Sequence, residues 1–520
     1  MGDRGGRGLR VVTVVIGTDD VARFRAAVGR RLGLHFDDGK LVFLADTLRQ
    51  RLDATGRGCE AYVGSIEAGL ATDEIGILAR DLTVSETYFF RNIEQFRATA
   101  EVALPERIAA RQGQKRLRLL SAGCASGDEA YSLGIVVTES AIDASWDVSI
   151  RAVDVNPSML EKAVRAQYST WALRETSAEV QRRWFRPEGR DVLLAEEARM
   201  RVRFEERNLA QDDPELWPPE SYDIVFCRNV LMYLLPETAQ RVIERITRSL
   251  VPGGFLFLGH AETLRGLSQS FHLRHTHGTF YYQRKERAEL PGCTYAQAPS
   301  ESTSETSPLV AAVDGADGWI DAIRRASERI ESLARTPIGA QVRREVSPID
   351  QPPRWDLGKA LELLKNERFA AALDVVQAFP AEAAIDPEVL LLRAVLLTHG
   401  GSFAVAEDTC RRLLAIDELN AGAHYLMALC REAEGDREGA AEHDQAAAYL
   451  DPAFAMPRLH LGLLARRHGD RKTALQELDQ ALLLLQREDA PRLLLFGGGF
   501  GRETLIDLCR AEIVACGGQP

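Results

Sequence analysis

An interval of 34 residues organises the last third of the chain. Alanine occurs at this interval four times, at Ala372, Ala406, Ala440 and Ala474. Other residues keep the same spacing, namely Gly401, Gly435 and Gly469, Asp417 and Asp451, and Phe369 and Phe403. Matched positions over four units are not expected by chance. We therefore expect residues 355–520 to form an array of similar structural units that each contact their neighbours, instead of one central core.

A period of this length is typical of paired antiparallel helices, with small alanines where the helices cross and glycine at the turn. In length and pattern the segment resembles the tetratricopeptide repeat. The resemblance implies an all-α domain with capping helices and a concave surface for an unidentified protein or peptide partner, without a catalytic role. The glycine-dense FGGGFGR at 496–502 follows the last repeat. Because no strand precedes it, a turn that caps the stack is favoured over an anion-binding loop.

The first half of the chain has a different pattern. Five short β-rich runs alternate with helical stretches, at 117–123, 148–154, 222–229, 255–260 and 279–284. This alternation predicts a parallel sheet covered by helices, an α/β domain that we place at 111–287. Residues 1–110 are expected to form a helical N-terminal domain, because apolar residues follow helical spacing there. A Ser-, Thr- and Pro-rich linker is predicted at 288–354, interrupted by an amphipathic helix near 319–334.

The composition argues against several classes of function. The formal net charge of −12 at pH 7 disfavours nucleic-acid binding, which needs a basic excess to neutralise phosphates. No apolar run approaches the ~20 residues that cross a bilayer, so no membrane insertion is expected. The eight cysteines form no CxxC pair, which indicates a reduced, cytoplasmic setting without disulfides or zinc. The sequence around His272, His275 and His277 shows no clear carboxylate ligand for a metal, so a surface or edge role is favoured and no metal site is predicted.

The strand at 117–123 leads into a loop suited to bind a ligand. Gly123 and Gly127 allow the backbone to approach a ligand closely, since glycine has no Cβ. Their spacing is G-x-x-x-G, which differs from the dinucleotide-binding G-x-G-x-x-G. Asp128 and Glu129 follow at the start of a helix, where they would repel a pyrophosphate and attract a cationic or zwitterionic ligand. The sequence therefore favours S-adenosylmethionine over a nucleotide phosphate.

Two further strand ends supply candidate ligand contacts. Asp154 closes the run 148–154, where a carboxylate can accept both hydroxyls of a ribose. Its alternative role is to cap the next helix, but Asn156 with Pro157 at the first turn can serve that need. Asn208 and Leu209 follow the next strand and are a candidate contact for the adenine edge. An ordinary turn is an equal alternative for that pair.

Five motifs occur in order along the first half of the chain. They are LTVSETYFFRN (82–92), SAGCASGDEAYSLG (121–134), VDVNPSMLEKA (153–163), FCRNVLMYL (226–234) and LVPGGFLFLGHAETL (250–264). Together they resemble the chemotaxis-receptor glutamate O-methyltransferase family (CheR-type), over about residues 20–285. The resemblance implies a helical N-terminal domain packed on a class I, Rossmann-like methyltransferase sheet, with S-adenosylmethionine between them. It also implies a small β-insert at about 183–204, which here resembles family members that do not bind a receptor tail peptide.

Carried over position by position, the resemblance implies a set of cofactor contacts. They are Ser85, Thr87, Arg91, Glu129, Asp154, Asn208, Leu209, Arg228 and Asn229. The chain departs from the family pattern at Ser85, where asparagine is usual, and at Asp128 and Ala130, where glutamate and proline are usual. A serine hydroxyl can donate one hydrogen bond, but it lacks the second polar group of an asparagine amide.

The resemblance implies methyl transfer from S-adenosylmethionine to glutamate side chains of chemotaxis-type receptors. The products are a glutamate methyl ester and S-adenosylhomocysteine, and the repeats would recruit or regulate partners. A carboxylate is already ionised near pH 7, so positioning and desolvation are expected to supply the catalysis. Arg91 is a candidate for orienting the carboxylate or the cofactor, and the Tyr233 hydroxyl for a hydrogen bond near the methyl group. The alternative is a catalytically weak or inactive scaffold that binds the cofactor and partner proteins.

Overall fold

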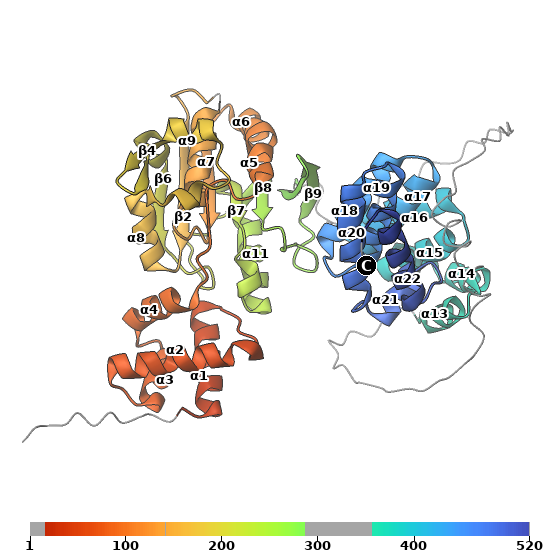
Figure 1. Ribbon diagram of the computed structural model, residues 1–520, viewed down its shortest axis with the longest axis horizontal. Coiled ribbons are helices and arrows are strands. Elements are labelled where there is room, and N and C mark those ends of the chain that lie inside the picture. The colour runs from red at the N-terminus through yellow and green to blue at the C-terminus, as the bar shows by residue number, and fades with distance from the viewer. Residues whose placement is uncertain (1–15, 141, 287–355, 519–520) are drawn as a thin grey trace, which may run out of the picture. The chain divides into compact units, whose positions relative to one another are not determined.

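A computed structural model describes residues 16–140, 142–286 and 356–518 (Figure 1). The chain divides into two compact units. The first unit comprises Met1–Glu262 and Ser270–Leu290, and the second comprises Thr263–Gln269 and Pro291–Pro520. The predicted linker at 288–354, with its helix near 319–334, lies outside the described residues. Each helix in the described ranges is too short or too polar to cross a membrane.

A seven-stranded sheet lies at the centre of the first unit, in the order β6-β2-β1-β7-β8-β10-β9. The strands span Val202–Glu206 (β6), Asp147–Asp154 (β2), Arg116–Ala122 (β1), Tyr222–Cys227 (β7), Leu250–Leu258 (β8), Thr279–Arg284 (β10) and Phe271–Thr276 (β9). The first five strands in this order are parallel, and β10 runs antiparallel to both of its neighbours. The predicted α/β class is confirmed, and all five strands expected from the sequence are present.

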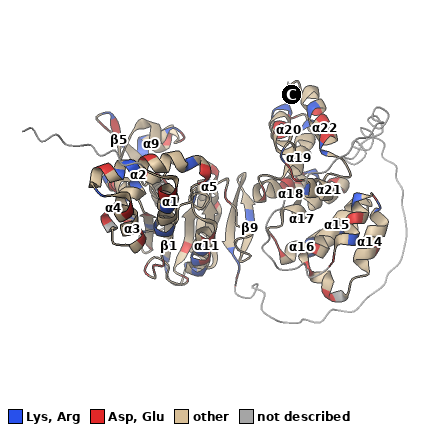
Figure 2. Ribbon diagram, turned by 90° about the horizontal axis from the view of Figure 1, so that it is seen from below, with Lys and Arg blue, Asp and Glu red and all other residues tan. Residues whose placement is uncertain are grey.

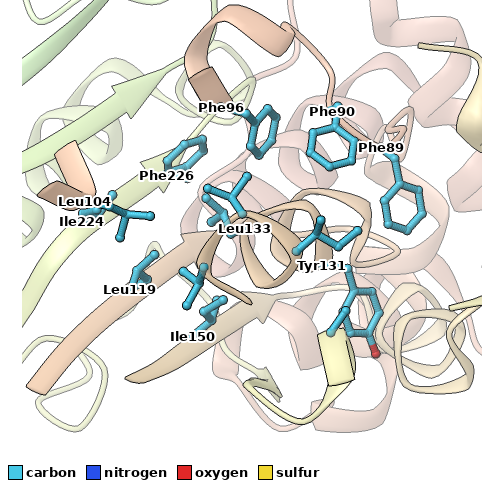
Figure 3. Packing of buried hydrophobic residues seen from close by; sticks show 14 of the residues in the cluster. Phe89, Phe90, Phe96, Leu104, Leu119, Tyr131, Leu133, Ile150, Ile224 and Phe226 are labelled. Atoms are coloured by element: carbon cyan, nitrogen blue, oxygen red, sulfur yellow. The ribbon is translucent and has the colours of Figure 1, made fainter. Parts of the chain in front are cut away.

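Helices cover the sheet because their apolar faces pack on the buried side chains of the strands. The helices that flank the strands are α5 (Ile93–Ala98), α6 (Leu104–Arg111), α7 (Asp128–Glu139), α8 (Pro157–Arg165) and α11 (Pro236–Ser249). Figure 3 shows Phe96, Leu104 and Leu133 packed beside side chains of β1, β2 and β7. Phe96, Phe226 and Phe257 form an aromatic row. The ring centroids of Phe96 and Phe226 are 5.6 Å apart, and those of Phe226 and Phe257 are 4.5 Å apart. Burial of such rings is a principal stabilising contribution.

A second, smaller sheet lies beside the first in the same unit. Its order is β3-β5-β4, from Gln167–Tyr168 (β3), Asp191–Leu194 (β5) and Phe185–Glu188 (β4), all antiparallel. Gly189 has a φ of +63° in the turn between β4 and β5, a conformation that favours glycine. Helices α9 (Ala178–Trp184) and α10 (Glu196–Arg199) flank this hairpin. The predicted insert at 183–204 contains two of these strands, and the third precedes it.

The first four helices of the chain form a group of their own, which meets the carboxyl edge of the sheet through the end of α1. They are α1 (Thr18–Leu32), α2 (Leu41–Thr55), α3 (Cys59–Ala68) and α4 (Thr72–Leu82). Helix α1 ends at Gly33, whose φ is +75° and whose carbonyl accepts a hydrogen bond from the Leu235 N–H at 2.8 Å. A Cβ at Gly33 would lie 2.6 Å from that of Ala210, so only glycine fits there. The backbone N–H of His35 then donates to the Tyr233 carbonyl at 2.8 Å.

Helix pairs build the second unit, as the 34-residue interval predicts. The pairs are α13 (Gly358–Lys365) with α14 (Phe369–Gln377), α15 (Pro387–His399) with α16 (Phe403–Ile416), α17 (Ala421–Ala433) with α18 (Arg437–Leu450), and α19 (Ala455–Arg467) with α20 (Arg471–Leu485). The repeated alanines at 372, 406, 440 and 474 are fully buried where the helices cross. The repeated glycines Gly401, Gly435 and Gly469 have φ values of 71–86° at the turns. Two more helices follow, α21 (Ala490–Phe496) and α22 (Arg502–Ala515).

Candidate active site

The loop between β1 and α7 contains three left-handed residues within five positions. Gly123, Ala125 and Gly127 have φ values of 81°, 45° and 86°. A Cβ on Gly123 would lie 2.4 Å from Cγ2 of Val230, and one on Gly127 would lie 2.8 Å from Cβ of Ala163. Both glycines are therefore required by the protein itself, because side chains of neighbouring loops and helices lie against them. The loop is held tightly at the carboxyl end of β1.

Asp154 ties this loop to the end of β2. Its Oδ2 accepts the Ala125 N–H and its Oδ1 accepts the Asn156 N–H, each at 2.8 Å. Burial raises the pKa of this carboxyl, against the lowering effect of its backbone hydrogen bonds. The predicted cap is confirmed, since the Asn156 side chain accepts the N–H groups of Ser158 and Met159 at the start of α8. A carboxylate has about four acceptor sites, so Asp154 keeps capacity for the hydroxyl groups of a ligand.

Glu129 and Arg228 form a buried ion pair between α7 and the end of β7. Arg228 Nη1 lies 3.3 Å from Glu129 Oε2, and the two side chains are 2% and 13% exposed. Glu129 also accepts a hydrogen bond from Ser121 Oγ at 2.7 Å. Burial raises the pKa of Glu129, opposed by the charge of Arg228. The Arg228 guanidinium is thus committed to protein contacts, and its predicted contact with the cofactor stays a prediction.

The segment before α5 carries three of the residues predicted from the family motif. Ser85, Thr87 and Arg91 are half-buried in the extended stretch between α4 and α5. Arg228 fixes the end of this stretch, because Nη2 donates to the Arg91 carbonyl and to Oδ1 of Asn92, both at 2.6 Å. The guanidinium of Arg91 itself donates to the Glu86 carbonyl at 3.1 Å. The structure therefore brings Arg91 and Glu129 together through Arg228.

Glu262 organises the loops that follow β7 and β8. This side chain is buried, and its carboxylate accepts four backbone N–H groups at 2.7–3.3 Å, from Asn229, Val230, Met232 and Gly259. Asn229 adopts a φ of +57° in this arrangement. Sequence reasoning missed Glu262, although its place four residues after β8 in the GHAETL motif was a usable signal. Its position makes it the support of the loop that leads to Tyr233.

Asn208 and Tyr233 lie where the N-terminal helices meet the sheet. Asn208 Nδ2 donates to the Arg31 carbonyl of α1 at 2.8 Å, and its Oδ1 accepts the Ala210 N–H at 2.9 Å. Leu209 is buried beside it, and its carbonyl accepts a hydrogen bond from Arg245. Tyr233 is half-buried, and within the described residues no hydrogen bond engages its hydroxyl. The Asn208 side chain thus makes hydrogen bonds within the protein, and the predicted roles of Asn208 and Tyr233 at the cofactor stay predictions.

Other candidate groups near this edge are not reactive. Cys124 and Cys227 are buried, and burial raises the pKa of each thiol well above its ordinary value, which disfavours the reactive thiolate form. His272 and His275 lie on β9, and His277 follows it. Contrary to expectation His277 has a carboxylate partner, since its Nε2 lies 3.0 Å from Glu101 Oε2, but no cluster of potential metal ligands occurs in the residues described. A cavity of about 960 Å³ is lined by Arg116, Arg118 and other polar residues at the opposite, amino edge of the sheet. That cavity is not part of the candidate site.

The fold and this acidic carboxyl edge are typical of S-adenosylmethionine-dependent methyltransferases. A family model described as "CheR methyltransferase, SAM binding domain" matches residues 85–280. The chain is 30% identical over 280 residues to chemotaxis protein methyltransferase 2 of Vibrio cholerae, covering 52% of this chain and 94% of that relative. The chain therefore belongs to the CheR family of chemotaxis methyltransferases, and S-adenosylmethionine is its methyl donor.

A second relative is similar along most of the chain. The probable biofilm formation methyltransferase WspC of Pseudomonas putida is 28% identical over 450 residues, covering 86% of this chain and 94% of that protein. Among solved structures, a thermophilic TPR protein of Thermus thermophilus covers 31% of this chain and 87% of its own, with 23% identity and a TM-score of 0.25. The helix pairs and the 34-residue interval define the repeats of this chain.

Proposed function

We propose that this protein transfers a methyl group from S-adenosylmethionine to glutamate side chains of chemotaxis-type receptors. The products would be a glutamate methyl ester and S-adenosylhomocysteine. The observation that carries the proposal is the placement of Asp154 at the end of β2, where it holds the loop that contains Gly123 and Gly127. Membership of the CheR family supports the receptor as the class of substrate.

The residues at this edge are chemically suited to the cofactor. The proposed contacts are Ser85, Thr87, Arg91, Glu129, Asp154, Asn208, Leu209, Arg228 and Asn229. Asp154 keeps acceptor capacity for ribose hydroxyls, and the carboxylates of Asp128, Asp154 and Glu129 around Cys124 create a negative environment that suits an amino group and a sulfonium. The cofactor supplies an electrophilic methyl group when it is bound.

The protein contributes position and exclusion of water to the reaction. The receptor glutamate is ionised near pH 7, so no side chain needs to remove a proton before the displacement. Arg91 would orient the incoming carboxylate or the cofactor, and the Tyr233 hydroxyl would hydrogen-bond near the transferring methyl group. Helix α1 packs over the same edge through Asn208 and Gly33, which reduces the access of water. Alignment and desolvation of the reacting groups then lower the barrier.

Transfer of labelled methyl groups to membranes that contain the native receptors tests this proposal. We expect label in receptor bands, and its release as methanol at alkaline pH, since methyl esters are hydrolysed by base. Asp154→Ala is expected to abolish labelling, whereas Asp147→Ala, at the exposed start of the same strand, should preserve it. If the wild-type chain binds S-adenosylhomocysteine in calorimetry but labels no receptor, the proposal is wrong and a scaffold role replaces it. Omission of residues 355–520 tests whether the repeats recruit the receptor.

A further inference from the structure

Helix α21 leaves the regular arrangement of the repeats. The first helices of successive pairs begin at 387, 421 and 455, so the next is due at 489, and α21 begins at Ala490. In a regular array this helix would stack on α20. Instead α22 packs along α20 (Figure 2), and α21 contacts α15, which lies three pairs earlier in the chain. The chain therefore crosses the face formed by the first helices α15, α17 and α19.

Phe496 anchors this crossing segment to that face. Its ring lies 6.0 Å from the ring of Tyr425 in α17 and 5.0 Å from that of Phe454, which precedes α19. A Cβ added to Gly422 in α17 would lie 2.7 Å from Cζ of Phe496, so the ring occupies a pocket that exists because residue 422 is glycine. Leu493 is the other buried side chain of α21. Two apolar side chains one helical turn apart thus face the repeats.

Polar contacts fix both ends of α21. The Tyr425 hydroxyl donates to the Phe496 carbonyl at 3.4 Å, and His399 Nε2 lies 3.3 Å from the Leu495 carbonyl. At the other end, the buried Glu488 accepts the Ala455 N–H at 2.7 Å. Tyr425 and His399 thus bind two carbonyls at the end of α21, and Glu488 binds the first N–H of α19. A peptide bound at this face would need its polar backbone groups satisfied in the same way.

The last repeat is capped by α22 and not by α21. Leu505, Ile506, Cys509 and Ile513 of α22 are buried, and this helix packs on α20. A helical array needs a terminal cap, and α22 supplies that cap. The connection between the two helices contains Gly497, Gly498 and Gly499, and the last two adopt φ values of 66° and 85°. Glycines restrict the backbone less than other residues do, so this connection constrains the position of α21 only weakly.

We propose that the face formed by α15, α17 and α19 is a peptide-binding groove that the chain's own segment 488–500 occupies. The partner is a short helical peptide that presents a leucine and a phenylalanine one turn apart, and it binds by displacing α21. The groove is therefore closed in the resting chain, and the apparent affinity for a partner is reduced by the fraction of molecules in which α21 is docked. This inference concerns the repeats alone and is independent of the proposed methyl transfer.

A labelled peptide of residues 488–501, EDAPRLLLFGGGFG, measures access to the groove in the full-length chain. Leu493→Ala combined with Phe496→Ala weakens the resident segment and is expected to raise peptide affinity at least about ten-fold over the wild type. Leu483→Ala, at an exposed leucine of α20, is the matched control and should leave affinity unchanged. Equal affinity of the double variant and the wild type, or no binding to either, overturns the proposal.

Two further measurements keep the test independent of that variant's stability. Gly422→Ala places a methyl group where the Phe496 ring lies, so it should expel α21, accelerate hydrogen exchange in 490–496 and also prevent binding of the peptide. In the wild type, excess unlabelled peptide should accelerate exchange in α21 while α19 and α22 remain protected. If α21 and α22 lose protection together, α21 is part of the structural cap and the proposal is wrong.

Discussion

Arg228 and Glu129 form an ion pair that joins the carboxyl end of β7 to the first turn of α7, inside the protein and away from water. Burial lowers the pKa of the Arg228 guanidinium and raises that of the Glu129 carboxyl, and each charge offsets the cost of burying the other. Arg228 also holds the carbonyl of Arg91, the residue proposed to orient the reacting groups. The pair therefore links the start of α7 to the segment before α5 that contains Arg91.

Arg228→Met should destabilise the first unit by about 3–5 kcal/mol, because it leaves Glu129 buried without its cation. The double variant Arg228→Met with Glu129→Gln should lose much less than the sum of the single variants, since no uncompensated charge remains. Urea unfolding followed by hydrogen exchange in β1 and β7 measures this unit separately from the repeats. Additive effects of the two substitutions would contradict the coupling.

Glu262→Gln should destabilise the loops after β7 and β8 by about 2–4 kcal/mol. Glu262 accepts four backbone N–H groups, whereas glutamine has one acceptor oxygen and directs an NH₂ group at other donors. Because the same loop leads to Tyr233, methyl transfer should fall as well. Glu244→Gln, at an exposed position of α11, is the control and should change neither stability nor turnover. An unchanged free energy of unfolding in Glu262→Gln would show that the four bonds are dispensable.

Asp128 gives the stability of the first unit a defined pH dependence. Burial raises the pKa of its carboxyl to about 6, from an ordinary value of 3.8. The folded state then binds the proton more tightly than the unfolded state, so this group's contribution to stability falls as the pH rises from about 4 to about 6. Ionised Asp128 should therefore cost about 3 kcal/mol at neutral pH.

The variant Asp128→Asn isolates this effect. Relative to the wild type it should be more stable above pH 7, and the advantage should vanish near pH 4, where Asp128 is protonated in the folded chain. Asp147→Asn is a control in which the pH dependence of stability should change in the opposite direction, because Arg118 holds the pKa of Asp147 below its ordinary value. Unfolding free energies of the three proteins, measured across this pH range, provide the comparison. A pH-independent difference between Asp128→Asn and the wild type would refute the burial of an ionised group.

Local patterns in the sequence predict most of this fold. The 34-residue interval fixes the helix pairs, because each pair repeats the same local crossing at a buried alanine. The strands β1, β2, β7, β8 and β10 are predictable from β-rich runs between helical stretches. Helix α21 was not predicted as a separate element, since its packing is decided by Gly422 and Tyr425, which lie some seventy residues before Phe496. A long-range contact of this kind leaves no periodic pattern.

The sequence predicted those residues of the candidate site that lie at the ends of strands. Asp154 and the glycines of the β1 loop follow strands directly, so their position at one edge of a parallel sheet follows from topology. Glu262 was missed because its partners are backbone N–H groups, which every residue except proline carries and no sequence pattern marks. The ion pair of Glu129 with Arg228 was missed for a related reason. Both were predicted as cofactor contacts, and their mutual contact depends on how α7 packs beside β7.

Arg91→Ala and Tyr233→Phe should separate binding from turnover. Arg91 lies beside the buried pair of Arg228 and Glu129, so its loss should raise the KM for S-adenosylmethionine or for the receptor. The Tyr233 hydroxyl is proposed to act near the transferring methyl group, so Tyr233→Phe should lower kcat roughly ten- to hundred-fold with little change in KM, the range expected for one hydrogen bond made in the transition state. Arg80→Ala, at an exposed arginine of α4, is the control. Wild-type kinetics in both variants would exclude Arg91 and Tyr233 from the reaction.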